Sequence, residues 1–192
     1  ISNLSELGVN VPGGFAITSS AFDEFLSSSK IDKVISKELA NLNVENLSDL
    51  RRVGKKLRGL ILKTPLPQNL ISEIEHAWLE VSQSGKSFAV RSSATAEDLP
   101  DASFAGQQET FLNIDGFDNL IDAVRKVYAS LFTDRAISYR RLRNFKGSLS
   151  ISVGVQEMVR SDIGSSGVAF TLDTESGYRG SIFITSSFGL GE

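Results

Sequence analysis

The chain has 192 residues, 41% of them hydrophobic, with 20 basic and 23 acidic side chains and a formal net charge of −3. This length suits one domain or two small lobes, and folding can bury about 70% of the surface. Absence of cysteine excludes disulfides and thiol chemistry, and a single histidine excludes sites that need two. The charge gives no argument for nucleic acid, and no apolar run approaches the ~20 residues of a membrane span. With no signal peptide, we expect a segment of a longer cytoplasmic protein.

The first part of the chain is predicted to be mainly helical. Thr18 is a suitable N-cap for a helix whose apolar side chains recur at helical spacing. Further helices are expected over residues 30–41, from Ser48 to Pro65, and again beyond that proline. We therefore expect residues 1–85 to form a mainly helical lobe.

The pattern changes to a mixture of strands and helices near Gly85. The apolar run Phe88–Val90 predicts a buried strand that enters a polar loop at Arg91–Ser93. Residues 94–106 hold few bulky apolar side chains and are expected to form a loop. The remaining predicted elements are a strand at 110–114, helices at 118–131 and 134–143, and strands at 151–155, 167–172 and 181–185, with a turn near Ser176-Gly177. Residues 86–192 are thus expected to form a mixed α/β lobe of the same domain.

The densest polar segment is Arg91–Thr110, which lies between two predicted strands. An arginine held at the end of a buried strand presents a fixed fork to phosphate oxygens. The small residues that follow let backbone N–H groups approach a phosphate closely. The segment suggests a phosphate-binding site, and the alternative is an ordinary loop in which Arg91 pairs with Glu97 or Asp98.

Two other features are interpreted as structural. Gly85-Lys86-Ser87 resembles the end of a P-loop, but Glu80 takes the place of its first glycine and the segment precedes a strand. We therefore expect Lys86 to be solvated. His76 lies beside an apolar helical stripe and has no second histidine, so it is expected at the surface.

A basic run covers residues 125–146, where seven lysines and arginines face a single acid, Asp134. Such a run can steer anions toward a binding site. We favour the alternative that it forms a solvated helix face or packs against another domain.

Several motifs occur in order along the chain. They are Val11–Phe15, Val90–Pro100, Ala102–Asn113, Asp134–Arg140, Val155–Val159, Ser165–Thr171 and Ser186–Glu192. As a set they resemble the N-terminal ATP-binding domain of the phosphoenolpyruvate synthases (pyruvate, water dikinases), within the family of phosphoenolpyruvate-utilising enzymes. The resemblance extends over essentially the whole chain. By pattern, pyruvate phosphate dikinase and rifampicin phosphotransferase share this domain.

The resemblance implies an α+β fold: an ATP-grasp-like nucleotide-binding domain with a helical N-terminal lobe and mixed or antiparallel sheets. It also implies that Arg91 contacts the ATP phosphates and that the loop Ser103–Thr110 folds over them. Gln156 would lie at the adenine. The ATP-contacting positions expected in this way are Arg91, Ser103, Gly106, Gln107, Thr110 and Gln156.

In this family, ATP phosphorylates a histidine on a swivelling domain, which carries the phosphoryl group to pyruvate. ATP, pyruvate and water thereby become AMP, phosphoenolpyruvate and phosphate.

The phosphorylated histidine segment has no match here, and the ligands of Mg²⁺ are expected beyond Glu192. We therefore expect no catalytic residue in this chain, little activity from it alone, and a parent enzyme that binds ATP and pyruvate, with a homodimer as one arrangement. The alternatives are the same domain of a dikinase or a rifampicin phosphotransferase, or a non-catalytic nucleotide-binding module.

Overall fold

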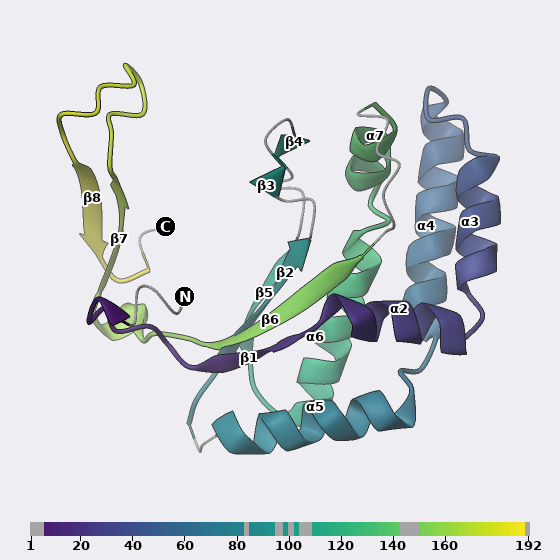
Figure 1. The fold of residues 1–192 in the computed structure, drawn as a ribbon, viewed down its shortest axis with the longest axis horizontal. Coiled ribbons are helices and arrows are strands. Elements are labelled where there is room, and N and C mark those ends of the chain that lie inside the picture. Colours follow the sequence, from purple (N-terminus) through teal and green to yellow (C-terminus); the bar gives the residue numbers. More distant parts are fainter. Residues whose placement is uncertain are drawn as a thin grey trace. The chain divides into compact units, whose positions relative to one another are not determined.

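The computed structural model describes residues 6–82, 85–94, 98–99, 102–103, 109–142 and 150–190, with backbone alone for 93–94, 98–99 and 102–103. The helices are α2 (Ser19–Ser28), α3 (Asp32–Ala40), α4 (Leu47–Lys63), α5 (Gln68–Val81), α6 (Phe117–Ser130), α7 (Asp134–Leu142) and the short 3₁₀ helix η1 (Ser161–Ile163). The strands are β1 (Gly14–Ile17), β2 (Phe88–Ala94), β3 (Asp98–Leu99), β4 (Ala102–Ser103), β5 (Thr110–Ile114), β6 (Ile151–Glu157), β7 (Ser165–Phe170) and β8 (Phe183–Phe188). Helices combined with antiparallel strands confirm the α+β class (Figure 1).

The predicted helices are found close to their expected bounds. Thr18 precedes α2, although its hydroxyl pairs with a neighbouring serine hydroxyl and not with the helix backbone. α4 begins with a true cap, because Asn46 Oδ1 accepts from the backbone N–H groups of Ser48 at 3.0 Å and Asp49 at 3.2 Å. A cap of this kind stabilises a helix by about 1 kcal/mol. α4 ends before Pro65, as expected of a residue that cannot continue a helix.

Strands distant in the sequence build one antiparallel sheet in the order β1-β6-β2-β5. β6 pairs along the whole of β2, from Phe88 opposite Glu157 to Ala94 opposite Ile151. β1 pairs with the other edge of β6, and β5 pairs with the other edge of β2. Elements on both sides of Gly85 therefore contribute to the same sheet.

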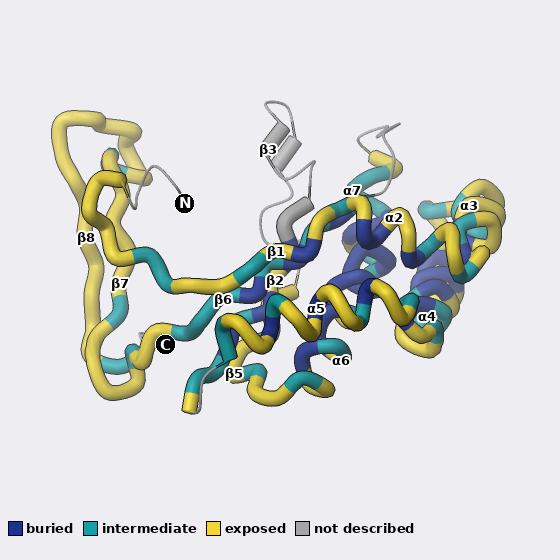
Figure 2. Tube along the Cα trace, turned by 60° about the horizontal axis from the view of Figure 1, so that its bottom comes forward, coloured by how far each residue is buried: buried dark blue, intermediate teal, exposed yellow. Residues whose placement is uncertain are grey.

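One face of this sheet packs against α2, α5 and α6. Phe88 and Val90 point to this face and are fully buried. The ring centroids of Trp78 on α5 and Phe88 lie 4.7 Å apart, and those of Phe22 on α2 and Tyr128 on α6 lie 4.8 Å apart. α4 packs on α6 and α3 on α4. The buried residues gather where these helices meet the sheet (Figure 2).

Three expectations about strands are wrong. Gly14–Ile17 forms β1, whereas no strand was predicted before Gly85. Arg91–Ser93 is not a loop, because β6 supplies backbone partners and β2 continues through these residues. Residues 94–106, expected to be a loop, contain the short antiparallel pair β3–β4.

The chain divides into two compact units, Ile1–Met158 and Val159–Glu192. The second contains η1 and the antiparallel hairpin β7–β8. The predicted turn near Ser176-Gly177 is present, and Gly177 donates its N–H to the Asp173 carbonyl at 2.8 Å. The lobes 1–85 and 86–192 remain a prediction from sequence patterning.

Candidate functional site

The face of the sheet opposite the helices carries the predicted phosphate-binding arginine. Side chains alternate between the two faces along each strand. Because Phe88 and Val90 are buried against the helices, Arg91 points the other way, and it is exposed. Its cross-strand neighbours are Gly154 on β6 and Thr110 on β5. Residues directly opposite one another share a face, so Arg91 and Thr110 lie side by side.

Gly154 leaves room for the side chain of Arg91 on β6. A Cβ atom at Gly154 would lie 3.5 Å from Arg91 Cγ, so the aliphatic part of the arginine lies over the glycine. Within the described part of the chain, the guanidinium of Arg91 has no ion-pair partner. Its alternative partners, Glu97 and the side chain of Asp98, lie outside the described residues.

Gln156 lies on the same face as Arg91, two positions after Gly154 on β6. Its Nε2 donates to the Pro12 carbonyl at 3.5 Å, which is the long limit of a hydrogen bond. The side chain is half-buried and weakly held. Its amide can therefore exchange this bond for one to a ligand at low cost.

β1 approaches β6 unusually closely at Gly14. A Cβ atom there would lie only 2.1 Å from the Val155 carbonyl oxygen, and the residue has φ 153°. Only glycine is compatible with this contact. Gly14 and Gly154 together leave the backbone of two neighbouring strands bare beside Arg91 and Gln156, as happens where a ligand approaches a sheet.

Most loop positions of the sequence prediction are not described. Gly106 and Gln107 lie outside the described residues, and Ser103 is described only as backbone, in β4 opposite Asp98. Their contacts with ATP stay predictions. The structure does bring together three of the predicted side chains on one sheet face: Arg91, Thr110 and Gln156.

The two glycines of this face, Gly14 and Gly154, were missed as site residues by sequence reasoning. A signal for Gly154 was available, because it lies between Val153 and Val155 and so occupies the polar face of a strand whose apolar residues alternate. An isolated glycine within a strand pattern indicates close approach of another group.

Other residues considered from the sequence have structural roles. Lys86 is not simply solvated as expected: its Nζ pairs with Glu157 Oε2 at 2.8 Å, and each side chain is about one third exposed. His76 is at the surface, as predicted, with its side chain 81% exposed.

Arg140 and Arg141 of the basic run donate to backbone carbonyls of the same chain. Burial lowers the pKa of Arg140 to about 10. These two arginines therefore support packing within the chain.

Among the described residues, no group of three or more His, Cys, Asp and Glu side chains could hold a metal ion. The same part of the chain includes no helix with the length and apolar character needed to cross a membrane.

The whole chain, residues 1–192, matches the family model described as pyruvate phosphate dikinase, AMP/ATP-binding domain. The chain therefore belongs to this family of AMP/ATP-binding domains.

The curated relatives that it resembles are phosphoenolpyruvate synthases. The enzyme of Neisseria meningitidis serogroup B is 58% identical over 197 residues, and that of Escherichia coli strain K12 is 51% identical over 195 residues. That of Deinococcus radiodurans is 52% identical over 193 residues. In each case the match covers 100% of this chain and 25% of the relative. The chain thus spans about a quarter of these enzymes and corresponds to their ATP-binding domain.

Proposed function

We propose that this chain is the ATP-binding part of a phosphoenolpyruvate synthase. We propose further that it holds ATP on the face of the sheet opposite the helices, which carries Arg91, Thr110 and Gln156. The observation that carries the proposal is the exposed side chain of Arg91, whose aliphatic part lies over Gly154 and which lies beside Thr110 on that face. An arginine with no partner among the described carboxylates retains its charge and its donors for a phosphate group.

In this proposal, different residues of this face contact the phosphates and the adenine of the nucleotide. Arg91 presents two parallel N–H groups to phosphate oxygens, and Thr110 offers a hydroxyl beside it. Gln156 presents both a donor and an acceptor, which suits the edge of an adenine ring. In this proposal the loop containing Ser103, Gly106 and Gln107 closes over the phosphates, and the domain is ATP-grasp-like.

Binding and positioning are the main tasks of a protein in phosphoryl transfer. In the parent enzyme, the bound ATP phosphorylates a histidine of a swivelling domain, and that domain then delivers the phosphoryl group to pyruvate. The products are AMP, phosphoenolpyruvate and phosphate. Magnesium ion would neutralise the phosphates, but the described residues offer no cluster to hold it. As the family resemblance implies, we expect its ligands in other parts of the parent.

Replacing Arg91 with alanine in the full-length parent tests the site. Loss of a hydrogen bond to a charged group costs about 1.5–3 kcal/mol, so we expect ATP affinity to fall by about ten- to a hundredfold, with phosphohistidine formation falling as well. Arg91→Lys should recover only part of the affinity, because an ammonium lacks the bidentate fork. The matched control is Arg135→Ala, which removes an exposed arginine from α7. Unchanged ATP binding in Arg91→Ala would refute the assignment.

The reaction is tested by incubating the parent with ATP and pyruvate. A synthase should yield AMP and phosphoenolpyruvate without added phosphate. A strict requirement for phosphate would identify a dikinase, and nucleotide binding without turnover would identify a non-catalytic module. The curated matches compared above all carry the name of the synthase, which favours the first outcome.

A further inference from the structure

The sheet face that carries Arg91 has an apolar end. Side chains alternate along a strand, so Met158 lies on the same face as Gly154 and Gln156. Although Met158 follows the last residue of β6, its N–H donates to the Ser87 carbonyl at 2.9 Å and continues the pairing with β2. The residue is half-buried and is the single methionine of the chain. Its apolar side chain therefore lies beyond Gln156, at the end of the face away from Arg91.

The thioether of Met158 is held by the backbone of β5. The Asn113 N–H donates to Met158 Sδ at 3.1 Å. The side chain of Met158 thus reaches across β2, because β5 and β6 pair with opposite edges of that strand. A methionine side chain has three rotatable bonds and adapts to many surroundings. The bond from Asn113 selects one arrangement of it.

The N–H of Asn113 is available to the sulfur because β5 is distorted at this point. The register between β2 and β5 shifts between Phe88 and Val90, and Asn113 has a φ of 57°. This left-handed conformation is unfavourable for residues other than glycine, although asparagine tolerates it better than most. Irregular strands and unfavourable backbone conformations are frequent beside ligand sites, where they direct a particular group. Here the directed group is the N–H that holds Met158.

Leu112 extends the apolar end of the face. Phe111 before it packs against the buried core, so alternation along β5 places Leu112 on the face of Met158. The leucine is 52% exposed. At the usual rise of a strand, Met158 lies about 13 Å from Gly154, the residue opposite Arg91. An extended nucleoside triphosphate spans this separation, with its phosphates at one end and its base at the other.

We propose that Asn113 is a positioning residue whose backbone N–H holds the thioether of Met158 where it and Leu112 contact the base of the nucleotide. The inference rests on the proposed function, because it needs the phosphates at Arg91. An aromatic ring suits this surface, since a thioether makes favourable contacts with aromatic rings and leucine covers apolar ring area. Gln156, before Met158 on the same face, is left to bond the polar edge of the ring.

A comparison of ATP with inorganic tripolyphosphate, which lacks the base, tests the contact in the full-length parent. We expect Met158→Ala to weaken ATP binding about three- to tenfold through loss of the sulfur–aromatic contact. Tripolyphosphate binding should not change, whereas Arg91→Ala should weaken binding of both ligands. Met158→Leu keeps the apolar volume and should retain most of the ATP affinity. Calorimetric titration measures all of these affinities.

The outcomes separate the inference from the proposed function. If Arg91→Ala weakens both ligands and Met158→Ala weakens neither, the inference is wrong and the proposed function stands. If Met158→Ala weakens both ligands equally, the residue supports the fold and does not contact the base, so the inference is again wrong. If neither substitution changes ATP binding, both are wrong.

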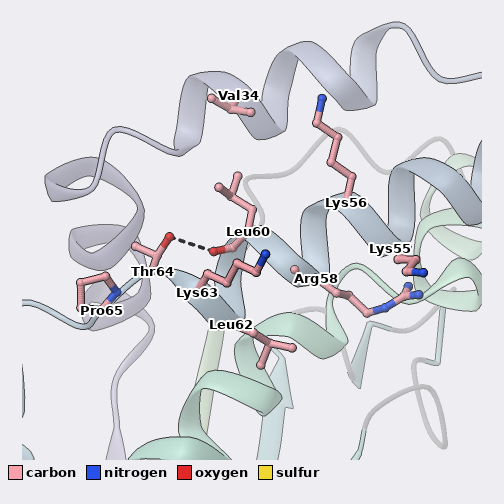
Figure 3. A pocket seen from close by; sticks show the side chains of 10 residues that line it. Val34, Lys55, Lys56, Arg58, Leu60, Leu62, Lys63, Thr64 and Pro65 are labelled. Atoms are coloured by element: carbon pink, nitrogen blue, oxygen red, sulfur yellow. Dashed lines mark hydrogen bonds between the residues drawn. The ribbon is translucent and has the colours of Figure 1, made fainter.

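Truncation of an exposed leucine elsewhere in the same unit is the control. Leu62 on α4 is 41% exposed and lines a shallow hollow of about 880 Å³ on the solvent-facing side of that helix (Figure 3). α4 packs on α6, which covers the other face of the sheet. Leu62→Ala should leave the affinity for both ligands unchanged, and Leu112→Ala should weaken ATP binding alone. Equal losses of ATP affinity in the two variants would contradict the assigned contact.

Two substitutions that differ in their tolerance of positive φ test the role of Asn113. Asn113→Gly keeps the left-handed backbone and its N–H, so ATP affinity should be unchanged. Asn113→Val disfavours this conformation and should turn the N–H away from the sulfur. ATP affinity should then fall as it does in Met158→Ala, without a change for tripolyphosphate. Unchanged ATP affinity in a folded Asn113→Val protein would refute the positioning role.

The methyl resonance of Met158 reports the contact in the unaltered parent, independently of how the variants fold. With isotope-labelled methionine methyl groups, the signal that disappears in Met158→Leu belongs to Met158. We expect ATP to move this signal upfield, because the methyl group would lie over an aromatic ring, and tripolyphosphate to leave it in place. A signal that responds to neither ligand, or equally to both, would overturn the inference.

Discussion

The ring of Tyr128 is completely buried, and its hydroxyl has no hydrogen-bond partner among the described residues. The ring packs against Phe22 and Phe25 of α2, with centroids 4.8 and 5.6 Å away. A buried polar group without a partner costs about 1–3 kcal/mol in lost hydration. The packing of Tyr128 is therefore favourable only through its ring.

We expect Tyr128→Phe to raise the free energy of unfolding by about 1 kcal/mol, since it removes this hydroxyl and keeps the ring. Burial, and secondarily the charge of Asp23, raise the pKa of Tyr128. Folding therefore opposes its ionisation, and stability that is present below about pH 10 is lost at higher pH. Urea unfolding at pH 8 and at pH 11 should show a larger gain from the substitution at the higher pH. Tyr178→Phe, at a side chain that is 63% exposed, should change little. A destabilised Tyr128→Phe protein would reveal a partner for the hydroxyl.

The adjacent glycines Gly13 and Gly14 make a second matched pair. A Cβ atom at Gly14 would collide with the Val155 carbonyl oxygen, whereas one at Gly13 would meet nothing within 4 Å. We expect Gly14→Ala to lower the free energy of unfolding by about 2 kcal/mol or more, because β1 must separate from β6. Gly13→Ala should stay within about 0.5 kcal/mol of the original chain. Urea denaturation measures both, and equal effects would contradict the proposed close contact.

Among the candidate site residues, the sequence indicated side chains more readily than the spaces between them. Arg91 was a candidate because a guanidinium after an apolar strand suits a phosphate group. Gly154 was not, because a glycine becomes informative only when its cross-strand neighbour is known. The neighbour is set by the pairing of β2 with β6, two strands that lie some sixty residues apart in the sequence. Local patterning cannot specify such a register.

At the level of elements, the helices were predictable, whereas β1, the end of β2 and the β3–β4 pair were not. α4 and α6 follow from apolar periodicity alone, because each buries one stripe of its surface. β1 has only four residues and includes a glycine, so it exists through its pairing with β6. β2 extends across Arg91–Ser93 for the same reason. Tertiary pairing overrides weak local propensity in both cases.

The contact of α4 with Phe132 and with the first residue of α7 provides a prediction at this scale. Arg58 Nη1 donates to the Phe132 carbonyl at 2.7 Å and to Asp134 Oδ1 at 3.2 Å, next to Gly54. Gly54→Ala would displace both partners, so we expect a loss of about 1–2 kcal/mol in unfolding free energy despite the better helix propensity of alanine. Gly59→Ala on the same helix should give a gain of about 0.5–1 kcal/mol. Thermal unfolding of the two variants tests the pair, and a gain at both positions would show that the Arg58 contact adds no stability.

At the scale of the whole molecule, the core is confined to the first compact unit. The buried hydrophobic residues of the described chain all lie between Ile17 and Val155. In the second unit, large apolar side chains are exposed on both strands of the hairpin, with Phe170 at 41% and Phe188 at 96%. The stability of the described chain is therefore expected to come almost entirely from the sheet and the helices on its covered face.

Truncation after Met158 should consequently leave a cooperatively folding protein. Little buried apolar area is removed, so we expect the free energy of unfolding to change by no more than about 1 kcal/mol. Binding of a hydrophobic dye should fall, because the exposed side chains of β7 and β8 are gone. As a control, truncation before Ser150 also removes β6, which pairs with both β1 and β2, and should abolish the cooperative transition. Urea unfolding followed by circular dichroism distinguishes these results. Loss of cooperativity already at Met158 would mean that the hairpin contributes to the core.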